Sequence, residues 1–222
     1  YASAVRSGEI VTGKRIKQAV ERFYSWLETA PSDGFFIDHQ KGLQIINFFE
    51  TFLVHTKGKM AGQPFILSPF QQFTLYNVFG WMQETPEGPI RRINNVYEKI
   101  GKKNGKTAVM AGVGLYCMSF DMEAGAEIYV GATKEEQAKL CFNQAVDFIN
   151  KSSGLKSIGF YNLQKEIKFK RFNSSLKPLG GDSKTQDGIN AHIAIIDEYH
   201  AHRDDSVKEN LESSMAARVQ PI

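Results

Sequence analysis

The stretch that most restricts the fold of this chain is IGKKNGKT, residues 100–107, which stands directly before a long apolar segment. A phosphate-binding loop needs backbone N–H groups in a tight turn, a lysine for the terminal phosphates and a hydroxyl for Mg²⁺ at a helix start. Gly105, Lys106 and Thr107 fit this pattern, while Ile100 stands where the first glycine usually does. The stretch therefore predicts a strand, a loop and a helix in that order. A solvated basic turn is the alternative.

A second motif, IAIIDE at 193–198, consists of four apolar residues followed by two carboxylates. A fully apolar strand of this kind is typical of a parallel sheet, and ligands bind at the carboxyl ends of such strands. We expect Asp197 to hold Mg²⁺ and Glu198 to polarise an attacking water. A plain strand that enters a polar loop is the alternative. The two motifs together favour an ATPase, and the second acid favours hydrolysis over transfer to a small molecule.

The rest of the chain predicts an α/β fold that follows a mainly helical start. Apolar residues recur at helical spacing in the first ninety residues, and strands then alternate with helices, which is typical of a sheet with parallel strands. We expect helices at about 14–30, 40–55, from Pro69 onwards, 107–120 and 134–150, and strands at 93–100, 126–133, 166–172, 176–180 and 192–198.

Composition limits the function only weakly. A chain of 222 residues can form one large or two small domains, and no apolar run approaches the roughly 20 residues that cross a bilayer. The net charge of +3 neither requires nor excludes nucleic acid. Cys117 and Cys141 lack a metal-binding or disulfide pattern, which predicts buried reduced thiols in a cytosol. Because the first residue is Tyr1 and no signal segment follows, we expect a piece of a longer polypeptide.

Several long segments, taken in order, resemble the large terminase subunit of tailed bacteriophages, the motor that pumps double-stranded DNA into a procapsid. They are FFETFLVHTKGKMAGQPFILSPFQQF, YEKIGKKNGKT, AEIYVGATKEEQA, DSKTQDGINAHIAIIDEYHAH and MAARVQPI. The resemblance implies a P-loop NTPase of the RecA-like ASCE type with a mainly parallel central sheet. It implies an N-terminal helical subdomain at 1–62 and an ATPase core at 63–222. The family commonly replaces the first glycine of the Walker A loop, so IGKKNGKT resembles its variant.

The resemblance also implies roles for single residues. Gln71 in LSPFQQF matches a glutamine that reads the adenine edge, a task that suits an amide because it both donates and accepts. Lys102 stands where the family often has an arginine at the γ-phosphate, although a lysine gives no planar contact. ATP and Mg²⁺ are the implied cofactors, held by the loop and by the Walker B acid. The nucleotide-binding residues are Gly101, Lys103, Asn104, Gly105, Lys106, Thr107 and Gln71, the metal ligands Thr107 and Asp197, and the catalytic residues Glu198, Lys106 and Lys102.

The implied partners are double-stranded DNA, the portal protein, the small terminase subunit and further copies in a ring, in the cytoplasm of an infected bacterium. Family members continue past ARVQPI into a nuclease domain, so we expect no DNA cleavage and little ATP turnover from these residues alone. A transition-state arginine from a neighbouring subunit is another family feature, and Asp187 stands at one of its known positions. Arg171, Arg203 and Arg218 are the candidates. A helicase-like translocase and a nucleotide-binding scaffold without hydrolysis remain alternatives.

Overall fold

The computed structural model describes residues 1–179 and 188–222. The chain forms two compact units, called the first and the second unit below: 1–50 with 66–96, and 51–65 with 97–222. These units do not coincide with the domain boundary predicted after residue 62, because 66–96 cluster with the N-terminal residues. As a division into domains it stays a prediction. Among the described residues, no helix has the length and apolar character that crossing a membrane requires.

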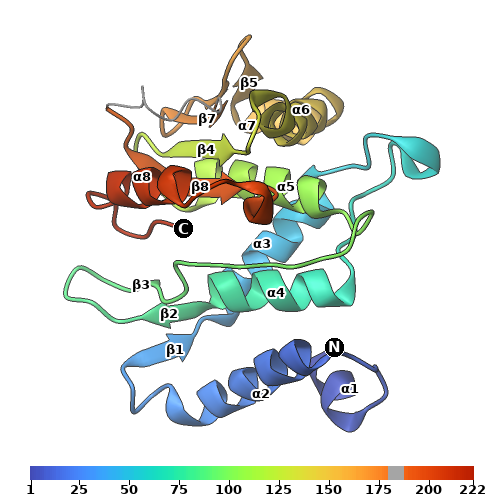
Figure 1. Ribbon diagram of the computed structural model, residues 1–222, viewed down its shortest axis with the longest axis vertical. Coiled ribbons are helices and arrows are strands. Elements are labelled where there is room, and N and C mark those ends of the chain that lie inside the picture. Colours follow the sequence, from blue (N-terminus) through green and yellow to red (C-terminus); the bar gives the residue numbers. More distant parts are fainter. Residues whose placement is uncertain (180–187) are drawn as a thin grey trace. The chain divides into compact units, whose positions relative to one another are not determined.

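The first unit contains the three helices expected at its start, together with a small sheet that the sequence did not predict (Figure 1). Its helices are α1 (Ala2–Ser7), α2 (Lys14–Thr29), α3 (His39–Phe52, whose last two residues belong to the second unit) and α4 (Pro69–Gly80). Its strands are β1 (Phe35–Ile37), β2 (Trp81–Gln83) and β3 (Ile90–Arg91), paired antiparallel in this order. Strands of two or three residues are too short to show an alternating pattern.

Aromatic side chains form part of the core of the first unit. The rings of Trp26 and Trp81 meet edge to face at 5.3 Å, and Phe35 lies 5.2 Å from Trp26 and 5.7 Å from Trp81. Edge-to-face contacts of this kind stabilise beyond the burial of the rings. Trp81 donates its indole N–H to Asn77 Oδ1 at 3.0 Å, which satisfies the polar atom of a side chain that is only 1% exposed. This cluster ties α2 and α4 to β1 and β2.

The second unit contains the expected helices and strands around the two motifs, apart from the strand before the loop (Figure 1). Its helices are α5 (Lys106–Phe120), α6 (Glu135–Lys151), α7 (Ser153–Ile158) and α8 (Ser206–Ser214), with short 3₁₀ turns at Gly58–Met60 and Tyr199–Ala201. Its strands are β4 (Glu127–Gly131), β5 (Phe160–Asn162), β6 (Ile167–Phe169), β7 (Ser174–Pro178) and β8 (Ala191–Ile196). Both cysteines are buried thiols that form no disulfide, as predicted.

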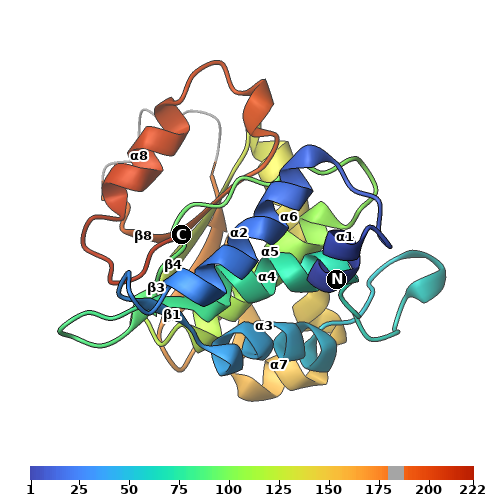
Figure 2. The same ribbon diagram turned by 90° about the horizontal axis from the view of Figure 1, so that it is seen from below.

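The sheet of the second unit has the strand order β5-β6-β7-β4-β8. Its β7, β4 and β8 run parallel, while β5 and β6 form an antiparallel hairpin at one edge. At the other edge the last residue lies beside β8 (Figure 2). Ile222 donates its N–H to His192 O at 3.1 Å and accepts from Ala194 N–H at 2.8 Å, the pattern of a parallel pair. The parallel strands place the ends of β4 and β8 at the same edge.

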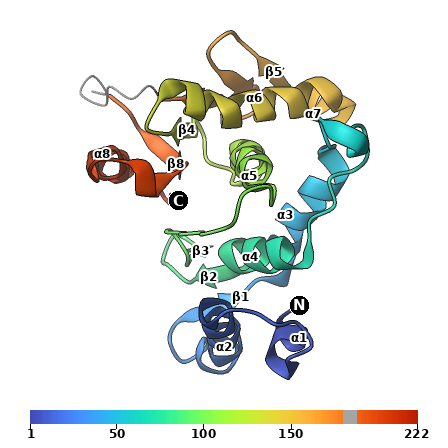
Figure 3. The same ribbon diagram turned by 45° about the vertical axis from the view of Figure 1, so that its right-hand side comes forward.

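Helices cover the two faces of this sheet (Figure 3). Leu211 of α8 packs with Tyr129 on one face, and α5 covers the opposite face with α6 beside it. Helix α5 approaches closely at Gly114, where a Cβ atom would lie 2.7 Å from Leu176 Cδ1. A residue without a side chain at this position allows the loop that begins α5 to sit at the carboxyl edge of the sheet.

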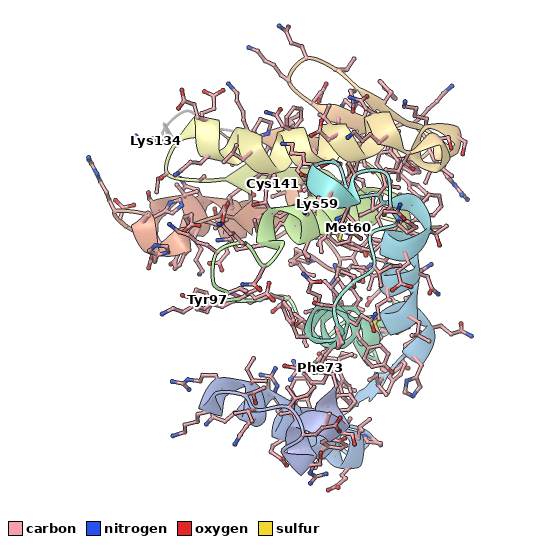
Figure 4. The ribbon with its side chains drawn as sticks, turned by 90° about the vertical axis from the view of Figure 1, so that its right-hand side faces the viewer. Lys59, Met60, Phe73, Tyr97, Lys134 and Cys141 are labelled. Carbon is pink, nitrogen blue, oxygen red and sulfur yellow. The ribbon has the colours of Figure 1, made fainter. Side chains whose placement is uncertain are left out.

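The strand predicted at 93–100 is wrong. The structure has no strand in that segment, and β3 ends just before it at Arg91. Most of its side chains are exposed, including Val96 at 43% and Tyr97 at 72%. Tyr97 is labelled in Figure 4. A strand needs a neighbouring strand to pair its backbone hydrogen bonds, and a run of apolar residues does not by itself supply that neighbour. The β8 edge of the sheet pairs with Ile222 instead.

Candidate nucleotide-binding site

The loop at 100–107 folds into a tight turn that its own side chains support. Asn104 donates its amide to the carbonyl oxygens of Gly101 at 3.1 Å and Lys102 at 3.3 Å. Gly105, the residue before α5, has a φ of 76°, and Lys103 has a φ of 67°. A left-handed φ costs glycine little but strains a residue with a side chain, so the backbone of the loop is strained at Lys103. Such strained positions are concentrated at ligand-binding sites.

Helix α5 begins at Lys106 and leaves N–H groups of its first turn without an acceptor inside the helix. The first helical bond of the turn runs from Val109 N–H to Gly105 O at 2.9 Å. The free N–H groups and the helix dipole make this end attractive to anions. Thr107 follows Lys106 in the chain and is half-buried in the same turn. The turn therefore offers N–H donors, an ammonium and a hydroxyl at one place.

The two motifs, 91 residues apart in the chain, meet at Lys106. Its Nζ lies 3.0 Å from Asp197 Oδ1 and 2.9 Å from Glu198 Oε1. Asp197 is held by its backbone N–H, which donates to Gly131 O at the end of β4, and its Oδ1 accepts from Glu198 N–H, each at 2.9 Å. Side-chain exposure rises from 10% at Asp197 to 38% at Glu198. The inner acid is thus fixed and the outer acid can reach solvent.

The charges at this place stabilise one another. A hydrogen bond from Lys106 holds the pKa of the Glu198 carboxyl below its ordinary value, and the charges of Lys106, His200 and Lys102 lower it further. In return, the hydrogen bond to Glu198 raises the pKa of Lys106, followed by the contacts with Asp197. At neutral pH the site therefore holds an ammonium and an ionised Glu198. An ionised Glu198 can accept a proton or polarise a water.

Two further residues lie near Glu198. The predicted Lys102 is exposed on the loop, where its charge helps to lower the pKa of Glu198. His200 was not predicted as a site residue, yet its Nδ1 lies 3.6 Å from Glu198 Oε2. Glu198 itself has a φ of 50° at the start of the Tyr199–Ala201 turn, which brings His200 back beside it. The spacing of two residues after the acid was the only sequence signal for this contact.

Metal ligation by protein side chains alone is not seen in the described ranges. No three His, Cys, Asp or Glu side chains there gather closely enough to hold a metal. Mg²⁺ is commonly bound by one or two protein oxygens together with substrate phosphates. Asp197, whose carboxylate is mostly buried beside an ammonium, and the hydroxyl of Thr107 are donors of that kind. The donor set present at this edge therefore fits Mg²⁺ with a nucleotide.

Gln71 lies in the first unit and has a local structural contact. Its Oε1 accepts the backbone N–H of Ser68 at 2.9 Å, which caps the start of α4. The side chain is mostly buried, and residue 71 is only 8% exposed. Capping by a glutamine three residues after a serine is a common way to satisfy a helix start. The contact of Gln71 with adenine stays a prediction.

The three candidate arginines differ in how firmly they are held. Arg218 donates to the carbonyl oxygens of Asn190 and Gly125 at 2.8 and 2.9 Å and pairs with Glu123 at 3.3 Å. This set of contacts gives Arg218 a structural role within the second unit. Arg171 stacks on Phe172 with a Cζ distance of 5.3 Å, and Arg203 is exposed. Asp187 lies outside the described residues.

Comparisons with known proteins find a matching family and similar sequences. A family model described as "Terminase large subunit, ATPase domain" matches residues 69–222. The large terminase subunit of Enterobacteria phage HK97 is 32% identical over 160 residues, 71% of this chain and 30% of that protein. The large terminase subunit of Lactococcus phage p2 is 25% identical over 144 residues, 63% of this chain and 27% of its own length.

A solved structure of the HK97 bacteriophage large terminase has the same fold. Its TM-score to this chain is 0.68 at 27% sequence identity, over 82% of this chain and 36% of that one. The predicted α/β fold of P-loop type is thereby confirmed. The chain spans less than a third of the length of the two phage relatives. From the family model and the meeting of the two motifs at Lys106, we conclude that the chain belongs to the family of terminase large subunit ATPase domains.

Proposed function

We propose that this chain is the ATPase domain of a phage DNA-packaging motor, which hydrolyses ATP to translocate double-stranded DNA into a procapsid. The observation that carries the proposal is the convergence of Lys106 with Asp197 and Glu198 at the carboxyl edge of the sheet. Family membership supports the ATPase activity. The proposed partners are DNA, the portal protein, the small terminase subunit and further copies in a ring, in the cytoplasm of the infected bacterium.

The loop would hold the triphosphate. Lys106 supplies positive charge to the β- and γ-phosphates, and the N–H groups of Gly101, Lys103, Asn104 and Gly105 supply donors. Exposed Lys102 would add a second positive charge near the γ-phosphate. Because a lysine is a point charge, Lys102 would attract that group without fixing its orientation. In the first unit, Gln71 would contact the adenine.

Mg²⁺, when bound, neutralises charge on the phosphate oxygens, and Thr107 with Asp197 would hold it. Without nucleotide, Lys106 compensates both acids. Transfer of Lys106 to the phosphates would leave Glu198 ionised and free to orient a water. The water would attack the terminal phosphorus while its proton moves toward Glu198, and the bond to the bridging oxygen would break to release ADP and phosphate.

The test is a comparison of three activities in the full-length protein. A packaging motor should hydrolyse MgATP and be stimulated by duplex DNA of any sequence, without separating its strands. Strand separation of a forked duplex would favour a helicase-like translocase. Tight ATP binding without turnover, with or without DNA, would favour a scaffold and contradict the proposal.

A further inference from the structure

We propose that the first unit carries a binding site for the phosphodiester backbone of DNA, in a hollow between α2 and the segment that follows β3. The hollow has a volume of about 260 Å³. Its lining consists of two arginines, two asparagines, a tryptophan and an isoleucine: Arg22, Trp26, Arg92, Ile93, Asn94 and Asn95. The inference rests on the proposed function, which makes DNA the partner of the protein.

The two guanidinium groups are positioned by aromatic rings. Arg22 Cζ lies 5.2 Å from the ring centroid of Trp26, and Arg92 Cζ lies 5.4 Å from that of Phe35. The two rings contact each other at 5.2 Å. Contacts over a ring face restrict a guanidinium group without neutralising its charge. Two positive charges are therefore held over neighbouring rings of the same core.

In the part of the chain that the structure describes, neither Arg22 nor Arg92 forms an ion pair. Arg6 of the same unit gives the contrast, since it stacks over Tyr24 at 4.4 Å and also pairs with Glu21 at 3.4 Å. Two arginines that line the same hollow without an acid favour an anion between them. The planar fork of arginine suits phosphate oxygens.

The opposite wall adds amide donors on a fixed backbone. Arg92 N–H donates to Trp81 O at 2.8 Å, which ties the start of the segment to β2. Asn94 and Asn95 follow after Ile93, and both are exposed. Asparagine amides and arginines commonly contact phosphate oxygens, and such contacts carry no sequence information. The hollow would therefore bind DNA irrespective of its sequence.

The face of α2 that lines the hollow continues beyond it toward the start of the helix. Arg15, Gln18, Arg22 and Trp26 follow one another at spacings of three or four residues, which places them on one face of the helix. Arg15 donates to Gln18 Oε1 at 3.4 Å. From the first to the last of these residues the helix rises roughly 16 Å. That span is too long for a single phosphate and suits a nucleic-acid backbone.

The experiment measures binding of this chain to a fluorescent duplex of mixed sequence by anisotropy, over a series of salt concentrations. The variants are Arg22→Gln, Arg92→Gln and both together. Log affinity falls as log salt rises, and each lost phosphate contact should reduce the steepness of this fall by about 0.9. This corresponds to an affinity that is about tenfold weaker at 0.1 M salt. The loss should be the same for a second duplex of unrelated sequence. An unchanged slope in the double variant would overturn the proposal.

Arg6→Gln is the matched control, because it removes one stacked arginine from the same unit outside the hollow. It should keep the slope of the unaltered protein, whereas a loss equal to that of Arg22→Gln would indicate a general charge effect and contradict the site. Circular dichroism checks folding. If the double variant does not fold, the two single variants decide the outcome in the same way.

Binding of a fluorescent ATP analogue to the unaltered protein separates this proposal from the proposed function. Retained ATP binding with an unchanged salt slope in the arginine variants would refute the DNA site and leave the ATPase proposal standing. A salt slope that depends on Arg22 and Arg92 would support the DNA site even if ATP did not bind. Loss of analogue binding in the double variant, with free ATP displacing the duplex, would make the hollow a nucleotide site and refute the DNA site.

Discussion

His192 Nε2 lies 2.9 Å from Asp121 Oδ2, and this pair joins β8 to α5 at the ends that point away from Lys106 and Asp197. The His192 side chain is fully buried, and that of Asp121 is 6% exposed. Asp121 follows the last residue of α5. The contact therefore fixes the helix against the strand at one end, while Lys106 and Asp197 face each other at the other end.

Removal of this contact should destabilise the second unit. Asp121→Ala would leave the buried Nε2 of His192 without its partner, and Nδ1 already lacks one among the described residues. A buried polar group without a partner costs about 1–3 kcal/mol, so the free energy of unfolding should fall by that amount. Urea denaturation measures the change. Asp147→Ala is the control, because Asp147 pairs with exposed Lys57 at 3.8 Å and should cost less than about 1 kcal/mol.

Glu198→Gln should separate turnover from binding. The amide keeps the shape of the side chain but cannot accept a proton, so the rate of ATP hydrolysis should fall by about 10²-fold or more while nucleotide still binds. Steady-state phosphate release in the full-length protein measures the rate. Glu135→Gln removes a carboxylate that pairs with Lys139 at 2.7 Å on α6 and should leave the rate unchanged. An unaltered rate in Glu198→Gln would refute the catalytic role.

Lys106→Ala should weaken nucleotide binding by about tenfold or more. The substitution removes the ammonium proposed for the phosphates and leaves Asp197 beside Glu198 without compensation. A charged hydrogen bond contributes about 1.5–3 kcal/mol, which corresponds to a loss of affinity of at least about tenfold. Titration with a fluorescent ATP analogue measures the affinity, with Lys139→Ala as the control. Tight binding by Lys106→Ala would contradict the proposed phosphate site.

The stability of the nucleotide-free protein should depend on pH through the same pair. The pKa of Glu198 is lowered on folding from 4.5, so its contribution exists above pH 4.5 and disappears as pH falls through the lower folded value. The pKa of Lys106 is raised from 10.5, so its contribution exists below pH 10.5 and disappears as pH rises through the higher folded value.

The difference in urea midpoint between the unaltered protein and Glu198→Gln should therefore be constant at intermediate pH and shrink at acid pH. A difference that grew as pH fell below 4.5 would be inconsistent with the lowered pKa of Glu198. Because Glu198 is partly exposed, solvent screens the pair and the whole effect should be small. Saturating MgATP should reduce it further if Lys106 then contacts phosphate.

The elements that the sequence predicted well are those whose pattern is long. Helix α2 shows several turns of helical spacing, and IAIIDE has the length of a buried strand, so periodicity and apolar content were sufficient. The segment at 93–100 also contains apolar residues, but it has no strand beside it. A single sequence does not show which edge of a sheet is free for pairing. The short strands β1 to β3 carried no pattern to detect.

The candidate site was predictable as a set of chemical groups rather than as a set of contacts. Lys106, Asp197 and Glu198 were proposed because a phosphate, a metal and a water each require a particular group, and their side chains lie together in the structure. The contact of His200 with Glu198 depends on the left-handed backbone at Glu198, which the sequence does not reveal. The carbonyl of Gly131, which holds Asp197, depends on the parallel pairing of β4 with β8.

The reactivity of the Cys141 thiol can report local opening between α5 and α6. Its Sγ lies 3.9 Å from Thr107 O, between α6 and α5 (Figure 4), and burial raises the pKa of the thiol to about 12. Alkylating reagents react with the thiolate, so modification at neutral pH requires the two helices to separate first. The rate of Cys141 alkylation would measure how often the start of α5 is uncovered, without any introduced label.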